Sequence, residues 1–116
     1  MPTAAETASF EAGIKLGALY HQFVGTPVST ESVPSLETAI ERSIANQPHC
    51  KRVSVNLDED RIEADANRFG YAEVTGTYLD VEVEIDYDGS TATARMGLED
   101  EYPMMRLVSV ENGPDL

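Results

Sequence analysis

Apolar residues return at helical spacing through the first part of the chain. The segment from about Ala5 to Phe23 predicts a long helix, because apolar positions recur every three or four residues. The recurring positions are Phe10, Ile14, Gly17, His21 and Val24, and the face is widened by Leu16, Leu19, Tyr20 and Phe23. We expect this helix to end at Gly25-Thr-Pro27, since glycine and proline interrupt helical backbone.

A second helical stripe follows a short polar segment. Its apolar positions are Val33, Leu36, Ile40 and Ile44. Ser32 is placed to cap this helix, and Pro34 is tolerated in a first turn. Pro48 predicts its end, because the residue before a proline is pushed away from helical conformation.

The pattern then changes to a period of two, which is typical of strands with one buried face. Apolar residues alternate with polar ones at Val53, Val55 and Leu57, and again at Val81, Val83, Ile85 and Tyr87. Asp88-Gly89 predicts a hairpin turn into a strand over residues 91–96. Residues 71–78 and 104–110 predict two more strands.

Two segments are less regular. Residues 60–67 fit a helix through Ile62, Ala66 and Phe69, but Ile62, Ala64 and Ala66 also fit a strand. We expect the tail, 111–116, to be frayed. Two helices followed by a run of strands predict an α+β fold, in which two N-terminal helices pack on one face of an antiparallel sheet. We expect residues 1–116 to form a single domain.

The charge balance narrows the choice of partners. The chain has 21 acidic and 8 basic residues, a net charge of −13. Such a surface repels phosphate backbones and anionic membranes, so we expect neither nucleic acid nor membrane as a partner. Adaptation to high salt is our preferred interpretation, and an ordinary acidic protein is the alternative. With no apolar run of membrane-spanning length and no secretory signal over Met1–Thr7, we expect a cytoplasmic protein.

Few residues suggest chemistry on their own. His21 stands at the end of the first helix, before a glycine- and proline-containing turn of the kind that often borders a ligand pocket. A hydrogen-bonded core histidine is the alternative. Glu11 by spacing alone is an exposed partner of Lys15, and Tyr102 is a half-buried tyrosine at a strand entrance. Cys50 is the only cysteine and has no neighbouring zinc motif.

The segment from Glu11 to Pro27, with its run Gly-Ala-Leu-Tyr-His-Gln-Phe, resembles the signature of the archaeal dihydroneopterin aldolase family. Shorter likenesses follow in the same order along nearly the whole chain, at Ser35–Glu41, Phe69–Tyr71, Ala94–Met96 and Tyr102–Met105. The abundance of acids and the scarcity of lysine depart from the family pattern, and we interpret this departure as surface adaptation.

This resemblance implies a lyase that splits 7,8-dihydroneopterin into 6-hydroxymethyl-7,8-dihydropterin and glycolaldehyde. It implies that Glu11 binds the pterin, that His21 stabilises the reacting species and that Tyr102 transfers a proton, with Tyr78 and Tyr87 as alternative tyrosines. It also implies a homo-oligomer, a tetramer in the family, with no cofactor and no metal ion. Retro-aldol chemistry agrees, because the conjugated C=N bond of a dihydropterin can itself hold the released electrons.

Helix geometry adds one expectation. Ten helical residues rise roughly 15 Å, so Glu11 and His21 of one chain cannot reach the same substrate atom. We therefore expect an active site shared between subunits. Two other functions stay open at this point: a pterin- or purine-binding module without turnover, and an assembly protein whose apolar helix is only an interface.

Overall fold

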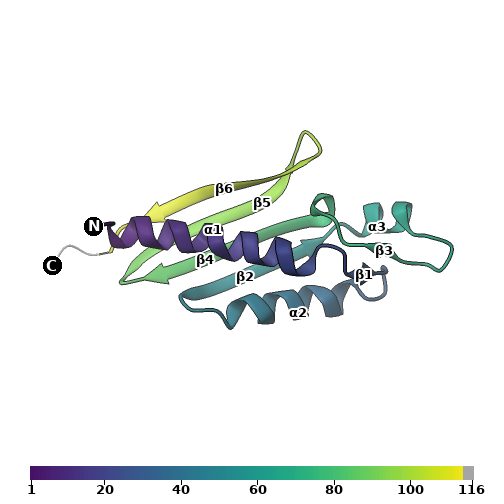
Figure 1. Ribbon diagram of the computed structural model, residues 1–116, viewed down its shortest axis with the longest axis horizontal. Coiled ribbons are helices and arrows are strands. Elements are labelled where there is room, and N and C mark those ends of the chain that lie inside the picture. Colours follow the sequence, from purple (N-terminus) through teal and green to yellow (C-terminus); the bar gives the residue numbers. More distant parts are fainter. Residues whose placement is uncertain (114–116) are drawn as a thin grey trace.

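The computed structural model describes residues 1–113 and has two main helices lying along one antiparallel sheet (Figure 1). In chain order the elements are α1 (Ala4–Phe23), β1 (Pro27–Val28), α2 (Val33–Ala45), β2 (Cys50–Leu57), α3 (Glu59–Asp65), β3 (Ala72–Glu73), the 3₁₀ turn η1 (Gly76–Tyr78), β4 (Leu79–Tyr87), β5 (Ser90–Glu99) and β6 (Tyr102–Glu111). The predicted α+β class, with α1 and α2 on an antiparallel sheet, is confirmed.

Helix α1 begins where the sequence supplies a capping box. The Thr3 hydroxyl accepts a hydrogen bond from the Glu6 amide, and the Glu6 carboxylate accepts one from the Thr3 amide. The predicted extent of this helix is confirmed to within one residue, but its predicted core face is wrong in part. Phe10 is 71% exposed and Ile14 is 41% exposed. The side chains that face the core are those of Ala8, Ala12, Lys15, Leu16 and Leu19.

Helix α2 buries its predicted stripe, with Val33, Ile40 and Ile44 inside and Leu36 packed against the core. Pro34 lies in the first turn as expected. The capping role predicted for Ser32 is wrong, because its hydroxyl pairs with Ser29 and makes no cap hydrogen bond to the helix.

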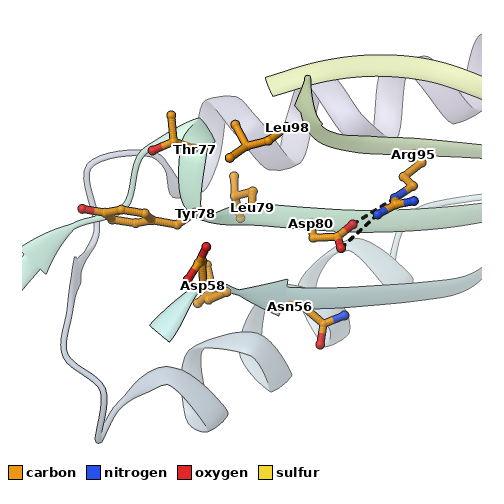
Figure 2. A pocket seen from close by; sticks show the side chains of 9 residues that line it. Asn56, Asp58, Thr77, Tyr78, Leu79, Asp80, Arg95 and Leu98 are labelled. Carbon is orange, nitrogen blue, oxygen red and sulfur yellow. Dashed lines mark hydrogen bonds and ion pairs between the residues drawn. The ribbon is translucent and has the colours of Figure 1, made fainter. Parts of the chain in front are cut away.

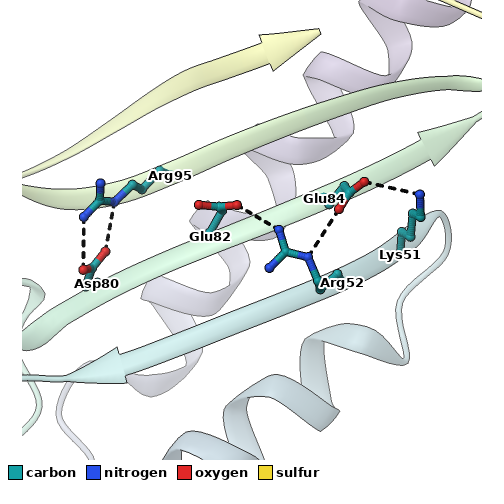
Figure 3. A network of polar contacts seen from close by, with 6 residues as sticks. All are labelled: Lys51, Arg52, Asp80, Glu82, Glu84 and Arg95. Atoms are coloured by element: carbon teal, nitrogen blue, oxygen red, sulfur yellow. Dashed lines mark hydrogen bonds and ion pairs between the residues drawn. The ribbon is translucent and has the colours of Figure 1, made fainter. Parts of the chain in front are cut away.

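The main sheet has the strand order β2-β4-β5-β6, and every neighbouring pair is antiparallel. Its inner face carries the core, including Val81, Val83 and Ile85 of β4. Its outer face carries ion pairs, which Figure 3 shows: Arg52 bridges Glu82 and Glu84, Lys51 joins Glu84, and Arg95 pairs with Asp80. The alternation along β4 therefore separates core from solvent, as its period of two predicts.

The two edges of this sheet differ. At the β2 edge, Glu41 of α2 accepts a hydrogen bond from the Val55 amide at 2.9 Å, and Glu37 accepts one from the Leu57 amide at 2.8 Å. Strand β6 forms the other edge, and its side chains are exposed except at Pro103, which is half-buried. Unpaired strand edges invite pairing with another chain, so the fold protects one edge and leaves the other accessible.

Three further predictions can be compared with the structure. Residues 60–67 are mainly helical, as α3. The strand predicted over residues 71–78 is confirmed only at Ala72–Glu73, which pair with β1; Gly76–Tyr78 form η1 instead. Part of the predicted fraying is also wrong, since Glu111 belongs to β6 and the Gly113 amide donates to Ser90; residues 114–116 lie outside the described part. No helix among the described residues has the length and apolarity that crossing a membrane requires.

Candidate active site

His21 lies in the last turn of α1, and its side chain is exposed. The helix ends at Phe23, Val24 is extended, and Gly25 then takes a φ of +96°, a conformation that glycine adopts without strain. The Gly25 amide donates to the carbonyl of Val74 at 2.8 Å, which ties the end of α1 to the segment leading into η1. The alternative of a core histidine is wrong, because the His21 side chain is exposed. An exposed imidazole at a helix end can reach a ligand.

Gly76 brings the end of α1 and the start of β6 together. A Cβ atom placed on Gly76 would lie 2.8 Å from Cε2 of Tyr20 and 2.7 Å from Cγ of Pro103. Tyr20 precedes His21 in the chain, and Pro103 follows Tyr102. The elements that hold His21 and Tyr102 therefore pack on the same glycine, at one end of the molecule (Figure 1).

Tyr102 is 61% exposed and follows a tight turn. The two turn residues, Asp100 and Glu101, both have positive φ, at 51° and 63°, which is the pattern of a two-residue hairpin. Arg61 of α3 donates two hydrogen bonds to the Glu101 carboxylate, at 2.9 and 2.8 Å. This paired contact lowers the pKa of the Glu101 carboxyl and ties the turn before Tyr102 to α3.

Glu11 lies near the middle of α1, about ten helical residues and roughly 15 Å from His21. Its carboxylate accepts a hydrogen bond from the Lys15 ammonium at 2.8 Å. The pairing at i and i+4 was expected, but the expectation that it lies in solvent is wrong, because Lys15 is only 3% exposed. The burial of Lys15 could have been predicted from spacing, because Lys15 shares one helical face with Ala8, Ala12 and Leu19.

The two alternative tyrosines have other surroundings. The Tyr78 hydroxyl donates to the Asp65 carboxylate, and burial, with that hydrogen bond, raises the pKa of Tyr78 to about 12. A phenol held so firmly in its neutral form is a poor proton donor near neutral pH. Tyr87 packs edge-on against His49, with ring centroids 4.9 Å apart. It ends the strand that begins beside η1, so it lies away from His21. Tyr102 is the most exposed of these three tyrosines.

A hollow of about 400 Å³ opens near the same end of the molecule. Figure 2 shows it, with the Asp80–Arg95 pair facing its interior from β4 and β5. Its lining residues are Asn56, Leu57, Asp58, Thr77, Tyr78, Leu79, Asp80, Arg95 and Leu98. Glu11, His21 and Tyr102 are not among them. Because Arg95 is already neutralised by Asp80, this hollow offers no unpaired cation for an anionic ligand. Residues 1–113 contain no group of three or more His, Cys, Asp or Glu side chains placed to hold a metal ion.

An apolar surface lies along α1 and β6, and Glu11 does not line its hollow. A shallow hollow of about 150 Å³ separates α1 from β6, with Gly13, Leu16, Met105 and Leu107 among its lining residues. Phe10 and Ile14 of α1 and Leu107 and Val108 of β6 are exposed. Exposed apolar side chains gathered over neighbouring elements mark an interaction surface.

The chain is similar to known proteins along almost its whole length. Residues 3–108 match the family model described as dihydroneopterin aldolase. A dihydroneopterin aldolase of Methanopyrus kandleri is 39% identical over 102 residues, which cover 86% of this chain and 84% of that protein. One from Picrophilus torridus is 33% identical over 102 residues, covering 86% and 83%. A crystal structure of a Picrophilus torridus protein superposes with a TM-score of 0.81 at 32% identity, covering 94% of this chain and 92% of that one.

Proposed function

Because the chain belongs to the dihydroneopterin aldolase family and is a carbon–carbon lyase, we propose that it cleaves 7,8-dihydroneopterin with Glu11, His21 and Tyr102. The products are 6-hydroxymethyl-7,8-dihydropterin and glycolaldehyde. The observation that supports these residues best is the close packing of both Tyr20 and Pro103 against Gly76, since it brings the supports of His21 and Tyr102 together.

The reaction needs three tasks from the protein. A proton leaves the 2′-hydroxyl as the bond between C1′ and C2′ breaks, which releases glycolaldehyde. The electrons of that bond pass into the conjugated C=N of the dihydropterin ring, and C1′ then takes up a proton. We assign Tyr102, with water, to the proton transfers and His21 to stabilising the charge that develops on the ring. The Glu11 carboxylate anchors the ring by accepting from its amino group and ring N–H.

One chain does not bring all three residues together. Glu11 stands roughly 15 Å from His21 along an uninterrupted helix. The exposed apolar side chains of α1, Phe10 and Ile14, neighbour Glu11 along the helix, and β6 is the accessible edge of the sheet. We propose that copies of the chain associate through the apolar surface of α1 and β6 as a homotetramer. Glu11 of one protomer then meets His21 and Tyr102 of a neighbour.

The cellular setting completes the proposal. We place residues 1–116 in one domain that acts in the cytoplasm of a salt-adapted archaeon, in the synthesis of a methanopterin- or folate-type pterin. The net charge of −13 supports salt adaptation. The chemistry needs neither cofactor nor metal, because the substrate itself stores the electrons.

The direct test is to incubate the purified protein, in high salt, with 7,8-dihydroneopterin and to separate the products by chromatography. We expect both products from the wild type, and a rate at least about a hundredfold lower in His21→Ala and in Tyr102→Phe. Tyr102→Phe should still bind the pterin. Tyr87→Phe is the matched control and should keep its activity. A folded wild type that binds the pterin without cleaving it would instead be a binding module.

A further inference from the structure

Lys15 is the one charged residue that is buried among residues 1–113. It lies on the face of α1 that packs against the sheet, in line with Ala8, Ala12 and Leu19. Its positive charge also opposes the burial that raises the pKa of the Cys50 thiol, at the start of β2. The ammonium therefore lies inside the protein, between helix and sheet.

Stability does not explain a lysine at this position. Removing an ammonium from water is costly, and an apolar side chain of similar volume often serves a core as well or better. Solubility does not explain it either, because a buried charge adds nothing to the surface. The chain has only two lysines, Lys15 and Lys51, so the residue type is otherwise scarce.

The contact that Lys15 makes points to a purpose. Among the described residues its hydrogen-bond acceptor is Oε2 of Glu11, at 2.8 Å. The Glu11 side chain is 24% exposed, whereas that of Lys15 is 4% exposed. One side of the carboxylate is thus fixed from within the core, and the other side reaches the surface. Each carboxylate oxygen has two lone pairs, so the bond to Lys15 leaves both oxygens able to accept from a ligand.

We infer that Lys15 is a positioning residue, which holds the Glu11 carboxylate in the orientation that binds the pterin ring. This inference rests on the proposed function, in which Glu11 is the pterin anchor. Lys15 itself has no surface to offer the substrate, so it acts through Glu11. A free glutamate on a helix surface samples several rotamers and would have to lose that freedom each time a ligand binds.

The test compares kcat and KM for 7,8-dihydroneopterin in Lys15→Met, Lys15→Arg, Glu11→Gln and the double variant Glu11→Gln/Lys15→Met. We expect Lys15→Met to raise KM roughly ten- to a hundredfold, with a much smaller change in kcat, because it loses an interaction with a charged group used in binding. Lys15→Arg should recover part of the loss. In the Glu11→Gln background the methionine should add little, since the carboxylate is already absent.

Lys51→Met is the matched control, because it removes the other lysine, which is exposed and pairs with Glu84 on the outer face; its KM should match the wild type. Lys15→Gln replaces the methionine variant if that variant does not fold. An unchanged KM in folded Lys15→Met, or an equal effect of that substitution with and without Glu11, would overturn the role of Lys15 alone. A wild type that neither binds nor cleaves the pterin would overturn the proposed function and this inference together.

Discussion

The side chains proposed for the active site differ from Tyr78 in what their polar groups contact. Tyr102, Glu11 and His21 each present a polar group to the surface, whereas Tyr78 is buried and donates its hydroxyl to Asp65. Tyr102 and Tyr78 are the same residue type, and they differ in exposure and hydrogen bonding. Tyr102 is therefore the one suited to the proposed proton transfer, and Tyr78 the one that supports the structure.

The Tyr78–Asp65 hydrogen bond should be visible in the titration of the tyrosines. Tyr78 has a pKa of about 12 in the folded protein, above its usual value of 10. A raised pKa favours the neutral phenol in the native state. Its stabilising contribution is therefore complete below pH 10 and is lost as the pH rises from about 10 to about 12.

Absorbance at alkaline pH should show one of the five tyrosines titrating late in the wild type, and this late step should be missing in Tyr78→Phe. The loss of unfolding free energy between about pH 10 and 12 should be smaller in Tyr78→Phe by about 2–3 kcal/mol. Identical alkaline titration curves for the two proteins would contradict the assignment.

Among the elements, α2 does more than cover the sheet. Glu37 and Glu41 accept hydrogen bonds from two amides of β2 that face the edge, and so protect that edge. Glu37→Ala and Glu41→Ala should each lower the unfolding free energy by roughly 1–3 kcal/mol, because each leaves a strand amide without its acceptor. Urea denaturation measures this loss.

Glu31→Ala is the matched control for the edge carboxylates. It removes an exposed carboxylate just before α2, for which the described residues show no side-chain hydrogen bond, and it should change stability by less than about 0.5 kcal/mol. Equal stability in all three variants would show that α2 protects the edge by packing alone.

The elements also show how far the sequence alone could go. The β4–β5 hairpin was predictable because alternation and Asp88-Gly89 are local signals. The strand predicted over residues 71–78 extends only over Ala72–Glu73. The chain then turns at Gly76, where Tyr20 and Pro103 pack closely against the glycine, and these contacts come from distant parts of the chain. Family resemblance supplied Glu11, His21 and Tyr102. The large apolar side chains of α1 favoured a core face containing Phe10, whereas the buried face is the one lined by alanines, which contains Lys15.

For the molecule as a whole, the acidic surface should make stability depend on salt. With a net charge of −13, repulsion within the folded state falls as ions screen it. At 1 M salt the screening length is already about 3 Å, so repulsion alone predicts little further gain beyond that concentration. A salt-adapted protein should show a thermal midpoint that keeps rising into molar KCl. A plateau below about 0.5 M would favour the ordinary acidic protein.

The apolar surface between α1 and β6 should hold the protomers together. Leu107 belongs to this surface and is exposed in the single chain, so Leu107→Glu places a charge within the surface. Light scattering on a sizing column should find a multiple of 12.6 kDa for the wild type and a smaller multiple for the variant. Phe69→Glu, which adds the same charge to an exposed side chain on the α3–β3 loop, should leave the assembly intact.

Shared active sites predict complementation between impaired variants. Glu11→Gln, assayed at a substrate concentration far below its raised KM, and His21→Ala should each keep only a small fraction of the wild-type rate, since each removes one half of every site. If Glu11 of one protomer serves with His21 of another, subunit exchange creates some sites that have both residues. Random exchange should then restore roughly a quarter of the wild-type rate for a site built from two chains. Mixed oligomers that form but stay inactive would place Glu11 and His21 in the site of one chain, and the separation along α1 would then need a change of conformation.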